Sequence, residues 1–74
     1  MNAQGRKEIA KNIASLKEIK DKLESMKDDE EEKYDNMPEG LQDSERGEQM
    51  QDAIEALENA CNSLDEAIDN LNDI

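Results

Sequence analysis

The densest group of chemically active side chains in this sequence is an acidic run, Asp28 to Glu32, near the middle of the chain. Paired carboxylates can perform acid–base catalysis, but only in a pocket that separates their pKa values. A chain of 74 residues with a single aromatic residue has little with which to wall such a pocket, and it has no histidine to act as a base or ligand. The sequence therefore predicts a protein that is not an enzyme and has no cofactor.

The spacing of the acidic run also argues against a metal site. A calcium-binding loop that began at Asp28 would place Glu30 and Glu32 at ligand positions and Glu39 at the twelfth position. The sixth position of such a loop requires a glycine for its sharp turn, and Lys33 occupies that position. We therefore expect no bound metal.

The single cysteine, Cys61, is the other candidate for chemistry. One cysteine cannot form an internal disulfide. A nucleophilic thiolate requires nearby positive charge, and the segment from Glu48 to Asp73 contains many acids and no base. The sequence thus favours a small buried side chain that packs between helices.

The overall charge limits the partners that this protein can attract. With 21 acidic and 9 basic residues, its net charge of −12 repels nucleic-acid backbones and anionic membrane surfaces. The sequence shows neither the apolar N-terminal run of a secretory signal nor a membrane span. We therefore expect a cytoplasmic protein that binds neither nucleic acid directly nor membranes, and whose partner is a protein with a basic surface.

Two segments of apolar periodicity predict the elements that carry these residues. The first extends from about residue 6 to 33, and its apolar side chains fall on one helix face: Ile9, Ile13, Leu16, Ile19, Leu23 and Met26. The second extends from about residue 44 to 73, with Ser44, or Asp43 one residue earlier, as its N-cap. Its seam alternates by four and three residues: Met50, Ile54, Leu57, Cys61, Leu64, Ile68 and Leu71. We predict a single all-α domain, residues 1–74, in which the two helices form an antiparallel, coiled-coil-like hairpin.

Small side chains beside the second seam predict a further contact. Ala53, Ala60 and Ala67 occupy one flanking heptad position, where they would let another helix approach closely. A chain of this length has a small core, so a single hairpin would be marginally stable. We therefore expect a homodimer in which these alanines form the oligomer interface and two hairpins make a four-helix bundle.

The linker, residues 34–43, carries turn signals. The segment Asn36-Met-Pro-Glu39 fits a capping box in which Glu39 reaches back toward Asn36. Met37 and Leu41 are apolar in a polar segment, and we expect them to pack over the end of the helix pair. Gly47, in the first turn of the second helix, should weaken that turn by about 1 kcal/mol relative to alanine.

Charge is divided unevenly along the sequence. Residues 1–27 carry a net charge of +3, whereas residues 28–74 carry −15. Antiparallel packing would place the basic first segment beside the acidic second helix, and unlike charges there would select this orientation. Packing does not explain the surplus of carboxylates at the turn end, because like charges repel one another within a Debye length of about 8 Å.

Two interpretations of the acidic turn end stay open. A solvated helix end is the simpler one, and a recognition surface for a basic protein is the functional one. Tyr34 and Met37 would either cap the hairpin or anchor the interface. The predicted protein-binding residues are Asp28, Asp29, Glu30, Glu31, Glu32, Tyr34, Asp35, Met37, Glu39, Glu48 and Asp52.

One stretch of the sequence resembles a known group of proteins. The segment Tyr34-Asp-Asn-Met-Pro-Glu-Gly-Leu-Gln-Asp-Ser-Glu-Arg-Gly-Glu48, with Met50 and the heptads built on Ala-Ile-Glu-Ala-Leu, resembles short acidic helical proteins of unknown function from low-GC Gram-positive bacteria and their phages. The resemblance covers about half of the chain. It implies a helical hairpin and an origin on a mobile element, and it supplies no catalytic or binding residues to transfer.

Three classes of function follow from these expectations. The first is a non-enzymatic protein-binding module, an accessory protein of a phage or mobile element that inhibits a basic surface of a host protein, including a defence or nucleic-acid-binding protein. The alternatives are a nucleic-acid mimic and a structural helix pair for virion assembly. The basic start of the first helix departs from the uniformly acidic surface expected of a mimic, which favours the first class.

Overall fold

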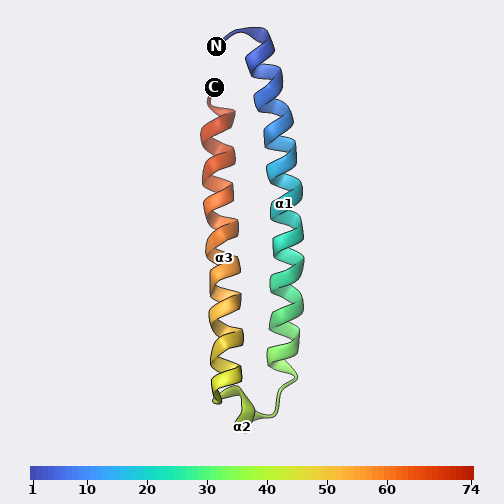
Figure 1. Cartoon of the computed structure of the whole chain (residues 1–74), viewed down its shortest axis with the longest axis vertical. Coiled ribbons are helices and arrows are strands. Elements are labelled where there is room, and N and C mark those ends of the chain that lie inside the picture. The colour runs from blue at the N-terminus through green and yellow to red at the C-terminus, as the bar shows by residue number, and fades with distance from the viewer.

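The computed structural model describes all 74 residues as an all-α chain without strands. Its helices are α1 (Ala3–Asp35), α2 (Glu39–Gln42) and α3 (Glu45–Asn72). Figure 1 shows α1 and α3 side by side and antiparallel, with both termini at one end and the short α2 at the other, so the predicted helical hairpin is confirmed. The molecule is a thin rod of 58 × 15 × 13 Å, and its radius of gyration is 17.0 Å, against about 11 Å for a compact chain of this length. None of the three helices combines the length and apolar character needed to cross a membrane.

Helix α1 begins earlier than the sequence predicts because Asn2 caps it. The Asn2 side chain accepts a hydrogen bond from the backbone N–H of Gly5 at 2.7 Å, which satisfies one of the free donors of the first turn. The helix then runs through Asp35, slightly beyond the expected end, and Asn36 closes it by donating its N–H to the Glu32 carbonyl. The acidic run therefore lies entirely within α1.

Of the two N-caps predicted for the second helix, Ser44 is confirmed and Asp43 is wrong. Ser44 has an extended backbone, and its Oγ accepts a hydrogen bond from the Gly47 N–H at 3.4 Å. Glu45 and Glu48 lie in the first turn, where the helix dipole favours negative charge. The observed helix differs from the expected range of 44–73 by one residue at each end.

The predicted capping box between Asn36 and Glu39 is wrong. Asn36 is the C-cap of α1, with a helical backbone (φ −84°, ψ −5°) in place of the extended one that an N-cap needs. The physical reason is that α1 continues to the residue before Asn36. The single turn of α2 starts after Pro38, whose carbonyl accepts hydrogen bonds from the N–H groups of Leu41 and Gln42.

The apolar face that the sequence predicts for the first helix is partly wrong. Ile19 and Met26 belong to that predicted face, yet they are 48% and 57% exposed. A series of half-buried side chains on α1 instead repeats at strict spacings of four and three: Ile9, Ile13, Leu16, Lys20, Leu23, Lys27, Glu30 and Tyr34. The half-buried Gly5, Glu24 and Glu31 lie outside this series. The heptads of α3 set this register, because only a matching period keeps two helices in contact along their whole length. Lys20 and Lys27 thereby take the seam positions beside Ile19 and Met26.

The core between the helices is thin. Cys61 and Ile68, at 6% and 5% exposure, are the only buried hydrophobic side chains, and both belong to α3. The Cys61 Sγ lies 3.9 Å from the carbonyl oxygen of Lys20, so this thiol packs against the backbone of α1. No residue of α1 is buried. Such a small core leaves the hairpin only marginally stable.

Charge pairing between the helices involves one residue of α1. The Nζ of Lys20 lies 2.6 Å from Asp65 Oδ1 and 3.4 Å from Glu24 Oε1. The remaining ion pair, Lys22 with Glu18, lies within α1. The predicted alignment of unlike charges along the shaft therefore amounts to a single bridge between the helices, of a partly exposed kind that contributes little stability.

Candidate functional site

Tyr34, at the end of α1, forms hydrogen bonds with both α2 and α3. It is half-buried at a seam position of α1. Its backbone carbonyl accepts a hydrogen bond from Gln42 Nε2 at 2.9 Å, and its hydroxyl accepts one from Gln51 Nε2 at 2.6 Å. Of the two roles considered for Tyr34, capping the hairpin is the one that these contacts serve.

Gly47 permits the close approach of α2 to α3. The residue is buried, and a Cβ built on it would lie 2.0 Å from the carbonyl oxygen of Gln42 and 2.6 Å from its carbonyl carbon. Only glycine lets two backbone segments approach this closely. The residue that the sequence marks as weakening a helix is therefore the one that allows the turn to close.

The acidic run does not form one patch, because consecutive residues of a helix point in different directions. Asp28, Asp29 and Glu32 are exposed, whereas Glu30 and Glu31 are half-buried, with Glu30 on the seam that faces α3. The other acidic residues predicted to bind a partner are all exposed: Asp35, Glu39, Glu48 and Asp52. The predicted site is thus distributed around the turn end.

The heptad register of α1 and α3 defines two long surfaces, one on each side of the seam between these helices. The seam residues occupy positions a and d, with the leucines of α1 and α3 at position d. One surface depression includes Lys17 and Asp65, which are both at position e. Another includes Lys33 and Arg46, which are both at position g. Position e of both helices therefore lies on one side of the seam, and position g of both lies on the other.

The flank formed by positions b and e is strongly acidic, and we call it the acidic flank. Its carboxylates are Asp21, Glu24, Asp28, Glu31 and Asp35 on α1, and Glu48, Glu55, Glu58, Asp65 and Asp69 on α3. Those on α3 are all exposed, and no base lies among them on that helix. The flank therefore presents a band of negative charge that is strongest toward the turn, because Lys7 and Lys17 hold the same positions on α1 nearer the termini.

The opposite flank, formed by positions c and g, is nearly free of charge on α3. From residue 49 to 70 it holds only small or neutral side chains: Gln49, Ala53, Ala56, Ala60, Ser63, Ala67 and Asn70. On α1 the exposed Ile19 and Met26 occupy position g and belong to the same side. We call the surface formed by Ile19, Met26 and the four alanines the alanine flank. Because 41% of the residues are charged, so long an uncharged band indicates a surface suited to protein contact.

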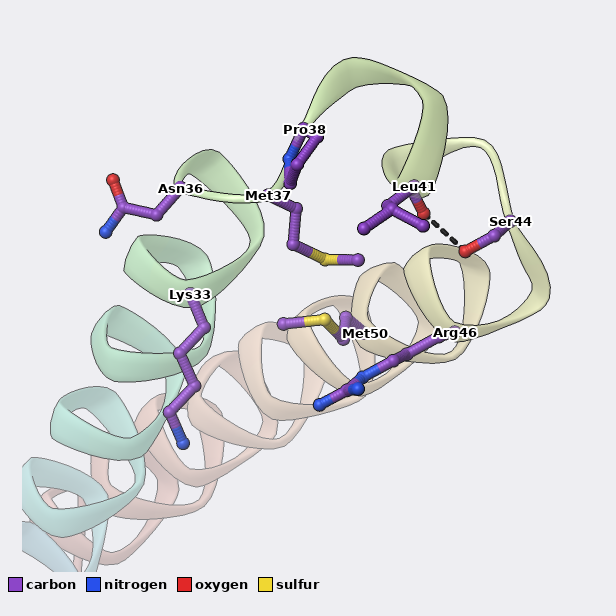
Figure 2. A pocket seen from close by; sticks show the side chains of 8 residues that line it. All are labelled: Lys33, Asn36, Met37, Pro38, Leu41, Ser44, Arg46 and Met50. Carbon is purple, nitrogen blue, oxygen red and sulfur yellow. Dashed lines mark hydrogen bonds between the residues drawn. The ribbon is translucent and has the colours of Figure 1, made fainter.

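A pocket lies where the alanine flank meets the turn. Figure 2 shows the side chains of Met37, Leu41 and Met50 converging there, with Lys33 of α1 and Arg46 of α3 beside them. The pocket volume is about 380 Å³, near the lower end of the range for small-ligand sites. Met37 and Leu41 are half-buried and exposed, respectively, so the residues expected to plug the turn instead border a hollow.

Sequence reasoning missed two residues of this pocket, Lys33 and Arg46. They are the only bases beyond Lys27, and that rarity is one signal that could have marked them. They also flank the predicted linker, residues 34–43, so the predicted hairpin itself places them near the same turn. No group of His, Cys, Asp or Glu side chains is arranged to hold a metal ion.

No protein-family model, curated protein or solved structure matches this chain. A fold of this kind does not determine a function by itself. Function must therefore be argued from the surface of the hairpin, where the acidic flank, the alanine flank and the turn pocket are the distinctive features.

Proposed function

We propose that the protein is a non-enzymatic binding module, an accessory protein of a phage or mobile element that acts in the host cytoplasm by binding and inhibiting a basic surface of a host protein. The acidic flank is the observation that supports this proposal most directly. Its carboxylates on α3 are all exposed, and Asp65 is the only one of them that pairs with a base of the chain. The others are free to pair with lysines and arginines of a partner.

The elongated shape of the acidic flank indicates what shape the basic surface of the partner should have. On α3 the carboxylates extend from Glu48 to Asp69, about 32 Å at 1.5 Å per residue, on a rod that is 15 Å wide. A basic strip or groove of similar length would gain association rate from this field, and added salt would weaken the attraction. A nucleic-acid-binding groove on a host protein has both the charge and the elongated shape.

Two charge-reversal variants test the proposal. Asp28→Lys/Glu55→Lys changes the acidic flank, and Glu8→Lys/Glu66→Lys changes the net charge equally at positions c and f, outside that flank. All four residues are exposed. In pull-downs from host lysate at low salt, we expect the native chain and the second variant to retain one host protein. The first variant should lose at least about tenfold in affinity, which corresponds to about 1.4 kcal/mol.

Other results of these experiments would reject the proposal or indicate one of the alternative functions. Capture that survives reversal of the acidic flank, or that is insensitive to salt, would reject the proposal. Competition between the chain and DNA for the captured protein would identify a nucleic-acid mimic. Copurification with phage particles at any salt concentration would instead indicate a structural role in the virion.

We further propose that two copies associate through their alanine flanks. Ala60 and Ala67 are half-buried and Ala53 is exposed in the single hairpin, so all three can still lose accessible surface. Ile19 and Met26 extend the same surface on α1. Helices of a bundle bury a third heptad position beside a and d, and position g of α3 fits that need. Pairing of these flanks leaves both acidic flanks facing outward.

Sedimentation equilibrium over a concentration series measures this association. The native chain should pass from monomer to dimer as its concentration rises. Ala60→Glu should stay monomeric, because its carboxylate would be buried between the copies. Asn59→Glu adds the same charge at the adjacent exposed position and should dimerise as the native chain does. A native chain that is monomeric at every concentration would contradict the proposal.

A further inference from the structure

The turn pocket differs in charge from the end of the molecule in which it lies. Residues 28–74 carry a net charge of −15, yet no carboxylate side chain lines the pocket. The only two bases of that segment, Lys33 and Arg46, both line it. They belong to different helices, so the closed turn is what brings them to one cavity.

Both cations are without partners in the chain. Neither forms an ion pair, and neither side chain makes a hydrogen bond. Asp29 precedes Lys33 by one helical turn, a spacing at which ion pairs form readily, but no such pair is present. Two unpaired cations beside one cavity attract an anionic group from outside the chain.

The hydrophobic side chains of the turn pocket indicate that its ligand also carries an apolar group. Met37, Leu41 and Met50 provide the hydrophobic part of the pocket, and Leu41 is 52% exposed. Methionine side chains adapt their shape to an incoming group. A bare anion would leave these side chains uncovered, whereas a neutral apolar group would leave the two cations without a counterion.

We infer that the turn pocket is a docking site for a segment of a protein partner in which a large apolar side chain adjoins a carboxylate. The apolar side chain covers Met37, Leu41 and Met50. The carboxylate pairs with Lys33 and Arg46. Charge complementarity and the apolar lining thus select the same occupant.

The docking site is separate from the acidic flank. Lys33 and Arg46 are at heptad position g, whereas the acidic flank consists of positions b and e. The pocket therefore opens on the other side of the seam. Its occupancy does not depend on a basic partner, so this inference and the proposed function can fail independently.

N-acetyl-L-leucine joins one apolar side chain to one carboxylate and is the probe for this chemistry. N-acetyl-L-leucinamide keeps the side chain and lacks the charge, and acetate has the charge alone. The four methionines of the chain can be labelled with carbon-13 at their methyl groups for NMR titration. Met37 and Met50 report on the pocket, whereas Met1 and Met26 lie outside it and serve as internal controls.

We expect N-acetyl-L-leucine to shift the methyl resonances of Met37 and Met50 with a millimolar dissociation constant, as is typical for so small a ligand. Its affinity should exceed that of the amide by about fivefold. The Lys33→Gln/Arg46→Gln variant should bind the acid and the amide equally. Lys7→Gln/Lys11→Gln, an equal change of charge at the other end of α1, should keep the native preference. Acetate should leave both pocket methionines unchanged.

Equal affinity for the acid and the amide in the native chain overturns the inference. The absence of shifts overturns it too, as do shifts spread over all four methionines. A second copy of the chain is the competing occupant. If N-acetyl-L-leucine dissociates a native dimer, and the Lys33→Gln/Arg46→Gln variant is monomeric without it, another copy fills the pocket and the assignment to a different protein is wrong.

Discussion

The two long helices contribute unequally to their common seam. On α3 the seam positions of residues 47–71 all hold apolar or small residues, and three residues of this helix are buried. On α1 no residue is buried, and Lys20 and Lys27 occupy seam positions. The apolar side chains next to them, Ile19 and Met26, remain largely exposed.

The difference leaves the interface incompletely filled by α1. The apolar seam and the alanines of α3 together form a surface broader than one helix covers. Lys27 weakens the interface within the hairpin, because its charge is half-buried in the seam without an ion pair. A hairpin built in this way has little internal stability and a large surface for external contacts.

The largest expected change in stability comes from a substitution in the buried seam of α3, and a substitution at an exposed position of α1 is its control. Ile68→Ala should destabilise the fold by about 2–4 kcal/mol, because it empties a site that is 5% exposed. A hairpin of this size has about 3–5 kcal/mol in total, so most of its helicity should be lost. Ile19→Ala, at a site that is 48% exposed, should cost under about 0.5 kcal/mol in the monomer. Circular dichroism melts in dilute solution measure both, and equal losses would contradict the register of α1.

The next effect tests whether the turn depends on one glycine of α3. Gly47→Ala should destabilise the hairpin by about 1–3 kcal/mol, since the new methyl group would overlap the backbone of Gln42. This cost should outweigh the gain of about 1 kcal/mol in helix propensity.

Gly40→Ala is the matched control for the turn, because a Cβ at that position meets nothing within 4 Å. The control should be neutral or slightly stabilising. Urea unfolding compares the two variants. If Gly47→Ala is as stable as Gly40→Ala, α2 does not pack against α3 at this distance.

A substitution that makes the seam of α1 apolar, as the seam of α3 is, should raise the stability of the hairpin by a smaller amount. Lys27 is half-buried and forms no ion pair. Lys27→Leu should therefore stabilise the hairpin by about 1 kcal/mol through added apolar burial. Lys11→Leu makes the same change at an exposed position and should have little effect. Equal urea midpoints for the two variants would place Lys27 outside the seam.

The sequence predicts α3 more accurately than α1 for a physical reason. Local signals specify α3, since its heptads are unbroken and Ser44 caps it. The apolar residues of α1 fit the face of an isolated helix, and only contact with α3 places Lys20 and Lys27 in the seam beside Ile19 and Met26. The register of one helix thus depends on its neighbour.

In the candidate site, too, some features follow from the local sequence and others depend on contacts between the helices. The surplus of carboxylates at the turn end could be predicted from the positions of the acidic residues and the expected hairpin. Their distribution between the flanks depends on the register of both helices. The pocket could not be predicted, because its lining depends on how α2 closes the turn around Met37 and Leu41. The role of Gly47 depends on α2, which the sequence signals only weakly.

The smallest expected effect concerns the single ionic bridge between the two helices. The pKa of Lys20 is raised above its ordinary value of 10.5, chiefly because its ammonium donates a hydrogen bond to Asp65, and also because the charges of Asp65 and Glu24 favour the protonated form. The folded chain therefore binds this proton more tightly than the unfolded chain does. The contribution of the bridge is complete below pH 10.5 and is lost as the pH rises above that value.

Asp65→Asn removes the partner of Lys20 and tests this pH dependence. At neutral pH the native chain should melt slightly above the variant, and the difference should shrink as the pH rises beyond 10.5. Asp69→Asn removes the same charge from the next turn of the acidic flank, where no ion pair exists. Because both variants relieve the repulsion among carboxylates, the comparison between them isolates the bridge. A difference in melting temperature that persists at high pH would show that the proton on Lys20 does not link α1 to α3.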